Sequence, residues 1–252
     1  MIMQVKSSLP VAAMIFSAVL LLASCSEVES LQGDASPKLQ SASSLCGGLL
    51  GEKGSGALEE LTGRNQFVDL SGYSPGAAAE GLKKQLEEKW KPRDPQEPLG
   101  SGEMLSWGPF NLCTPSVREG GVAKDFISLD VSWSNSATID ELREGRESSA
   151  VEKDDSRTDF QAFSIGPDVY AELKESGFYL YFECAVPGAS PEQEENLPLM
   201  ARLSDQWTDK KGRATPARYS RILMPAARAT AKSLGCTNAL ELPVDATPKP
   251  SA

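Results

Sequence analysis

The cysteines restrict the fold of this chain more than any other feature of its sequence. Cys46, Cys113, Cys184 and Cys236 are far apart, and a fifth cysteine, Cys25, follows an apolar N-terminal segment. No two of the four later cysteines lie within five residues of each other and the chain has no histidine, so the ligand spacing of a zinc site is missing. We therefore expect no metal site and, in an oxidising compartment, two disulfides.

Four cysteines can pair in three ways, and the sequence does not choose among them. Sequential pairing, Cys46 with Cys113 and Cys184 with Cys236, would close loops of 67 and 52 residues. On the chain-entropy model each such disulfide stabilises the fold by about 4 kcal/mol.

The N-terminal segment has the layout of a signal peptide. Residues 1–8 carry one charge, on Lys6, and residues 11–22 carry none before the small pair Ala23-Ser24. As a helix, the apolar run would cover about 20 Å, less than the roughly 30 Å of a bilayer core, so a permanent membrane span is the weaker interpretation. The sequence Leu22-Ala23-Ser24-Cys25 resembles the bacterial lipobox, which implies cleavage before Cys25 and diacylation of its thiol. An ordinary secreted protein is the alternative.

The chain divides into four predicted parts. Residues 1–24 are a lipoprotein signal peptide, and residues 25–44, rich in Ser, Gln, Asp and Gly, form a flexible tether. Residues 45–243 form a single α+β extracytoplasmic domain, with two similar halves, 45–135 and 159–243, as an option suggested by the cysteine placement. Residues 244–252 are a disordered tail.

Three helices are predicted. Residues 57–61 form a short helix ended by Gly63, after a glycine-rich stretch at residues 47–56 that indicates a loop around a disulfide. Residues 77–90 follow Ser74-Pro75 and place apolar side chains at every fourth position. Thr215-Pro216 begins a helix that ends at Gly235, and Pro225 within it should kink or split it.

Strands are predicted in the middle of the chain. The clearest spans residues 127–134, where apolar side chains alternate with Ser and Asp. The other predicted strands span residues 110–113, 160–165, 169–173, 178–186 and 199–203, and residues 141–158 form a long exposed loop. The fold class is α+β: an antiparallel sheet with helices packed on one face, joined by two disulfides.

Tyr179 and Tyr181 alternate with the apolar residues of their predicted strand and so lie on its opposite face. They either line a binding surface or are covered by a second layer or a neighbouring loop. We favour the covered arrangement.

Composition excludes several classes of function. The net charge of −10 argues against nucleic-acid binding. Without histidine the commonest general base is missing, and no Ser-x-x-Lys motif with supporting context replaces it. The adjacent acidic pairs are interpreted as solvated surface: Glu59-Glu60, Glu87-Glu88, Asp154-Asp155 and Glu194-Glu195. We expect no catalytic residue and no cofactor.

Several segments resemble small actinobacterial lipoproteins of unknown function, Streptomyces-like in style. The resemblance rests on the lipobox residues, on Leu-Cys-Gly-Gly-Leu-Leu at 45–50 with Ala-Leu-Glu-Glu-Leu-Thr-Gly at 57–63, and on Phe-Glu-Cys at 182–184 with residues 226–238. It covers most of the mature chain. It implies the location and the disulfides, and no chemistry.

The expected function is a non-catalytic binding or interaction module. A lipid on Cys25 would hold it at the outer face of the cell membrane, and its partner would be an envelope protein or a small ligand. The alternative is a cell-envelope enzyme that uses carboxylates, which requires two convergent Asp or Glu side chains in a deep pocket.

Overall fold

The structure is a computed structural model of the whole chain. It describes residues 38–70, 72–89, 108–119, 122–134, 138–146, 160–187, 198–207, 212–237, 242 and 247–251. The predicted signal peptide, Cys25 and most of the predicted tether therefore lie outside the described residues. No helix within the described ranges is long and apolar enough to cross a membrane.

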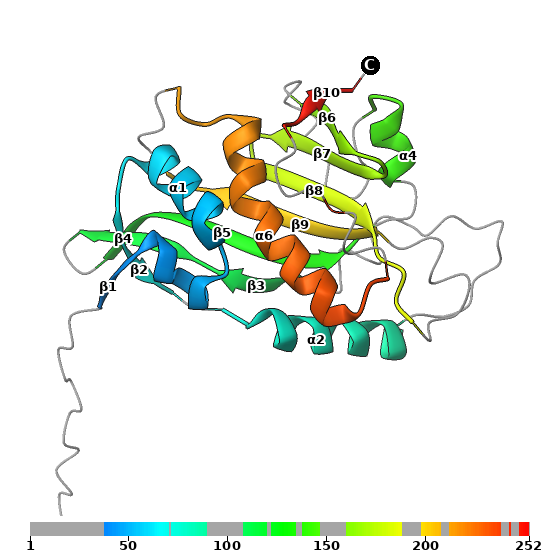
Figure 1. The fold of residues 1–252 in the computed structure, drawn as a ribbon, viewed down its shortest axis with the longest axis horizontal. Helices are drawn as coiled ribbons and strands as arrows, with labels where there is room; N and C mark the ends of the chain where they lie inside the picture. The colour runs from blue at the N-terminus through cyan, green and yellow to red at the C-terminus, as the bar shows by residue number, and fades with distance from the viewer. Residues whose placement is uncertain are drawn as a thin grey trace, which may run out of the picture. The chain divides into compact units, whose positions relative to one another are not determined.

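One antiparallel sheet organises the folded unit, which begins at Pro37. Its ten strands run in the order β1-β2-β4-β5-β9-β8-β7-β6-β10, and β3 pairs with β5 outside this path (Figure 1). The strands are β1 (Leu39–Ser41), β2 (Gln66–Asp69), β3 (Phe110–Cys113), β4 (Pro115–Glu119), β5 (Val122–Trp133), β6 (Gln161–Gly166), β7 (Val169–Lys174), β8 (Gly177–Glu183), β9 (Pro198–Asp205) and β10 (Lys249–Pro250).

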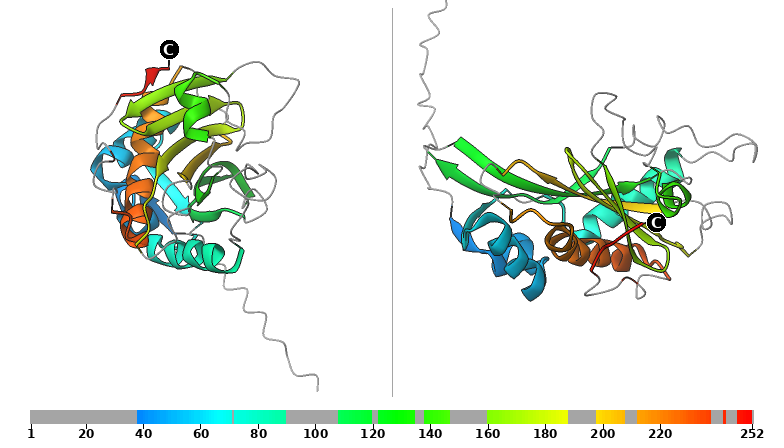
Figure 2. Two further views of the ribbon diagram at one scale, coloured as in Figure 1. Left: turned by 90° about the vertical axis from the view of Figure 1, so that its right-hand side faces the viewer. Right: turned by 90° about the horizontal axis from the view of Figure 1, so that it is seen from above.

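Three helices cover one face of this sheet, and the predicted α+β class is confirmed. They are α1 (Gly51–Thr62), α2 (Pro75–Lys89) and α6 (Pro216–Leu234). Figure 2 shows α1 and α6 along the same side of the strands. The 3-10 helix η1 (Ala42–Gly48) precedes α1, and the short helix α4 (Thr138–Arg143) packs on the opposite face, against side chains of β8 and β9.

Alternate residues of the central strands fill the main core. The pleat of β5 turns Ile127, Leu129, Val131 and Trp133 toward the helices, as their alternation with Ser and Asp predicts. Trp133 also donates its indole N–H to the backbone oxygen of Leu82 in α2, at 3.0 Å. The strand and the helix are thus joined by packing and by one buried hydrogen bond.

Helix α6 begins and ends where its sequence predicts. The Thr215 side chain accepts the N–H of Arg218, and Gly235 ends the helix with φ of 81°. Pro225 does not split the helix, which continues from Pro216 to Leu234. Because proline has no N–H, Pro225 cannot bond the carbonyl of Arg221 in the turn before it. Gly54 of α1 packs at this carbonyl: a Cβ at Gly54 would lie 3.1 Å from it.

The folded region extends further toward both ends of the chain than predicted. The flexible tether was expected to reach Ser44, but β1 pairs with β2 and Ala42 is fully buried. The disordered tail was expected over residues 244–252, but β10 pairs with the edge of β6 and the Ser251 N–H donates to Ala162. Both segments are held by backbone pairing, which needs no apolar periodicity.

Three local predictions were also wrong. The glycine-rich stretch is helical from Gly51 onward, because Gly51, Gly54 and Gly56 lie inside α1; Gly54 faces α6, whereas Gly51 and Gly56 are exposed. The first residues of the loop predicted at 141–158 instead end α4. The two proposed halves differ in element order and share one sheet, in which β5 of the first pairs with β9 of the second.

Candidate functional site: a polar row on the second face of the sheet

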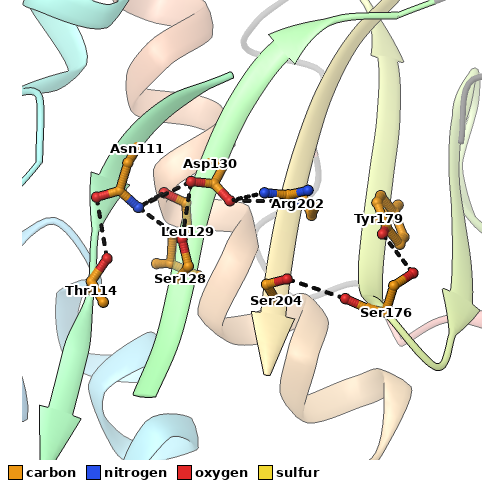
Figure 3. A network of polar contacts seen from close by, with 9 residues as sticks. All are labelled: Asn111, Thr114, Ser128, Leu129, Asp130, Ser176, Tyr179, Arg202 and Ser204. Carbon is orange, nitrogen blue, oxygen red and sulfur yellow. Dashed lines mark hydrogen bonds and ion pairs between the residues drawn. The ribbon is translucent and has the colours of Figure 1, made fainter. Parts of the chain in front are cut away.

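The second face of the sheet carries a row of polar side chains that crosses five strands. Strand register places Asn111, Asp130, Arg202, Tyr179 and Glu172 side by side on β3, β5, β9, β8 and β7. We call these five residues the polar row. Figure 3 shows the first four on their successive strands. They occupy the positions that alternate with the core residues, so their side chains point away from the helices.

Asp130 is the centre of a buried hydrogen-bond network at one end of the polar row. Arg202 donates from Nε and Nη2 to Oδ2, at 3.1 and 2.7 Å. Asn111 Nδ2 and the Ser128 hydroxyl both donate to Oδ1, each at 3.0 Å. The Asp130 side chain is 6% exposed and that of Arg202 is 34% exposed, so the carboxylate is buried and the guanidinium reaches solvent.

Glu172 is the buried charge at the other end of the polar row. It is fully buried, and the Tyr181 hydroxyl donates to its Oε1 at 2.6 Å. The Lys174 ammonium lies 3.5 Å from its Oε2, and the Lys174 side chain is itself only 9% exposed. Both carboxylates of the polar row are therefore paired with a cation and with hydrogen-bond donors, as buried charges require.

A second layer covers Tyr179 and Tyr181, as the favoured alternative predicted. Both tyrosines are buried in a small cluster with Ile139 and Leu142 of α4 and with Met200. The Tyr179 hydroxyl is 2.8 Å from that of Ser176. These aromatic rings therefore form no open surface. The accessible part of the polar row consists of Arg202 and Asn111, and the half-buried residues Ser128 and Ser204 lie beside them.

The two buried carboxylates do not converge. Asp130 and Glu172 are separated by β9 and β8, which puts about 14 Å between their strands. Glycosidases place their two carboxyl groups roughly 5 to 10 Å apart. The acidic pairs Glu59-Glu60 and Glu87-Glu88 are exposed, as predicted, and residues 154–155 and 194–195 lie outside the described ranges.

A second charged group lies at the surface beside α4. Arg143 contacts Asp140, the Asp168 carboxylate at 3.1 Å and the Tyr170 hydroxyl at 3.2 Å. Glu183 belongs to the same region: burial raises the pKa of its carboxyl, Asp168 raises this pKa further, and Arg143 lowers it. The ion pairs are about half exposed and contribute little to stability.

The cysteines pair sequentially. Cys46 is bonded to Cys113 and Cys184 to Cys236, with Cα atoms 5.5 and 5.0 Å apart. The first pair joins η1 to β3, and the second joins the end of β8 to the end of α6. Within the described ranges, the group of side chains spaced for a metal ion is formed by Cys46, Asp69 and Cys113, two of which are engaged in the first disulfide.

Nothing in the sequence singled out Asp130, Arg202 or Glu172. Each is a charged residue at the middle of a strand, and a strand with one solvated face places charges there routinely. The signal available was an opposite charge at the centre of another predicted strand, because Asp130 and Arg202 both sit among alternating apolar residues. Comparison with known proteins gives no match: neither a family model, nor a curated protein, nor a solved structure matches this chain.

Proposed function

We propose that this chain is a lipid-anchored extracytoplasmic protein whose folded domain is a non-catalytic binding or interaction module at the outer face of the cell membrane. The sequence Leu22-Ala23-Ser24-Cys25 supports the anchor. The two disulfides support an oxidising, extracytoplasmic compartment.

The observation that carries the binding half of the proposal is the partly exposed side chain of Arg202. Helices cover the first face of the sheet, whereas on the second face the Arg202 side chain is 34% exposed, with the cross-strand pair of Ser128 and Ser204 two residues further along. Two nitrogens of Arg202 donate hydrogen bonds to Asp130, which fixes the plane of the guanidinium. The third nitrogen, Nη1, remains as a positioned donor. Such a group suits recognition of a polar partner rather than acid-base chemistry, because arginine does not titrate near neutral pH.

The anchor is tested by intact-mass spectrometry and detergent-phase partitioning of the exported protein. The natural chain should carry the mass of a diacylated cysteine and partition with membranes, and Cys25→Ala should lose both. Ser24→Ala is the matched control, because it keeps a small residue before Cys25 and should leave lipidation intact. Equal membrane partitioning and lipid mass for Cys25→Ala would refute the anchor.

The binding face is tested by photo-crosslinking in intact cells. A photoreactive amino acid replaces Ser204, which is half-buried beside Arg202, and in a second strain it replaces Glu59, which is exposed on α1. We expect crosslinked species specific to position 204 that weaken when Arg202→Gln is added. Identical products from the two positions, or none from position 204, would count against this face as the binding surface.

A further inference from the structure

The first disulfide has a carboxylate beside it. The last residue of β2, Asp69, places its Oδ1 3.6 Å from the Cys46 sulfur. The two sulfurs and the carboxylate oxygen all lie within 4.8 Å of one another. Three separate elements, η1, β2 and β3, supply these groups, so the fold assembles a set that the spacing of the cysteines along the chain does not indicate.

These separations suit a tetrahedral metal ion. With metal–sulfur and metal–oxygen distances of about 2.3 and 2.0 Å, a tetrahedral site puts sulfur and oxygen roughly 3.5 Å apart and two sulfurs roughly 3.8 Å apart. The 3.6 Å between the Cys46 sulfur and Asp69 Oδ1 already matches the first of these values. In the reduced chain the two sulfurs must move apart to the second separation, which requires rotation of the Cys46 and Cys113 side chains.

The second oxygen of Asp69 is held in place. Its Oδ2 accepts the backbone N–H of Cys46 at 2.9 Å, which leaves Oδ1 directed at the sulfurs. A ligating carboxylate is commonly oriented by such an outer hydrogen bond. Cys46 itself has φ of 52° and ψ of 38°, a left-handed conformation that few residues other than glycine adopt. Strained backbone of this kind clusters at functional sites.

The first disulfide is also the more accessible of the two. Cys46 is half-buried although its partner Cys113 is fully buried, whereas Cys184 and Cys236 are 2% and 7% exposed. Thiol–disulfide exchange requires access to one sulfur in line with the disulfide bond. We therefore expect a reductant to open the first disulfide at Cys46 before it opens the second.

We propose that Cys46, Cys113 and Asp69 form a redox-gated site for a thiophilic divalent metal ion of the zinc class. In the oxidised chain the disulfide excludes the metal. A dithiol reductant transfers two electrons to the disulfide and itself becomes a disulfide, which leaves two thiols on the chain. The metal ion then binds both sulfurs and the Asp69 carboxylate and releases two protons, with water completing the tetrahedron.

The test measures metal binding by the full mature protein before and after reduction with a phosphine, which is oxidised to its oxide and leaves free thiols. Zinc is titrated by calorimetry, and cobalt is used as a probe because its thiolate charge-transfer band reports sulfur ligation. We expect one equivalent of either metal after reduction and none before it. Mass spectrometry after alkylation identifies which cysteines were reduced.

The variant Asp69→Asn distinguishes a metal site with three protein ligands from metal binding by the two thiols alone. Asparagine retains an acceptor for the Cys46 N–H but loses the charged ligand, so zinc affinity should fall at least about tenfold. Unchanged affinity in Asp69→Asn, or no binding by the reduced natural chain, would overturn the proposal. If reduction unfolds the chain, zinc must restore its circular dichroism spectrum, and failure to do so also overturns it.

Discussion

Asp130 and Arg202 lie directly opposite each other on β5 and β9, and both hydrogen bonds from the guanidinium end on one oxygen of the carboxylate. Asn111 and Ser128 hold the other oxygen. The pair is asymmetric, because the Asp130 side chain is 6% exposed and the Arg202 side chain is 34% exposed. The two partners should therefore differ in what their removal costs.

Removing the cation should destabilise the fold more than removing the anion. Arg202→Met leaves a buried carboxylate without its counter-ion and should lower the free energy of unfolding by about 2–4 kcal/mol. Asp130→Asn leaves a guanidinium that can turn toward solvent and should cost about 1 kcal/mol. Urea unfolding at neutral pH measures both values.

The double variant Asp130→Asn with Arg202→Met supplies the control. It has no charge at either position of this pair, so we expect it to be more stable than Arg202→Met alone. The contrary outcome is that the two single variants lower the free energy of unfolding equally, with effects that add in the double variant. That result would mean that the interaction does not depend on the burial of Asp130.

Two glycines in the first half of α1, Gly54 and Gly56, offer a matched pair. A Cβ at Gly54 would lie 3.1 Å from the Arg221 carbonyl of α6, whereas a Cβ at Gly56 would have no neighbour within 4 Å. Both positions are helical, so alanine gains about 0.5–1 kcal/mol of helix propensity at each. We expect Gly56→Ala to raise the thermal unfolding midpoint and Gly54→Ala to lower it. A rise in both would mean that α1 and α6 can separate at no cost.

The spacing of apolar residues and the residues that begin and end helices predicted the elements that pack on the helix-covered face of the sheet. Apolar side chains alternate from Ile127 to Trp133 because one face of β5 packs against the helices, and Thr215, Pro216 and Gly235 mark the ends of α6 through local chemistry. Short strands escaped prediction: β2 and β4 have four and five residues, and their pairing comes from neighbours distant in sequence. Length alone makes such strands hard to distinguish from loops.

The polar row could not be predicted for a related reason. Its positions on the second face follow from alternation, but the burial of Asp130 depends on β9, which begins 68 residues later at Pro198. The burial of Tyr179 and Tyr181 depends on α4, a six-residue helix whose Ile139 and Leu142 are its only buried apolar side chains. Long-range strand order decides which polar groups meet, and local patterns do not contain it.

The second disulfide should carry more stability than any single polar contact. Cys184 and Cys236 are separated by 52 residues and tie the sheet to the end of α6. Replacing both with alanine should lower the free energy of unfolding by about 4 kcal/mol. Denaturant unfolding of this variant is compared with that of the natural chain, both with the first disulfide intact. A loss below about 1 kcal/mol would mean that the unfolded chain gains little freedom when this loop opens.

Tyr219 gives the fold a dependence on alkaline pH. Burial raises the pKa of its hydroxyl, and the hydrogen bond that this hydroxyl donates to Asp205 at 2.7 Å raises the pKa further. In the unfolded chain the tyrosine ionises near its ordinary pKa of about 10. Above that pH the unfolded state loses the proton while the folded state retains it, so the contribution of Tyr219 to the free energy of unfolding is constant below about pH 10 and falls as pH rises beyond it. Tyr219→Phe should flatten this decline, and Tyr73→Phe, at a side chain that is 54% exposed, should not. Unfolding curves collected across alkaline pH distinguish the two variants, and equal slopes for both would show that another group controls the alkaline transition.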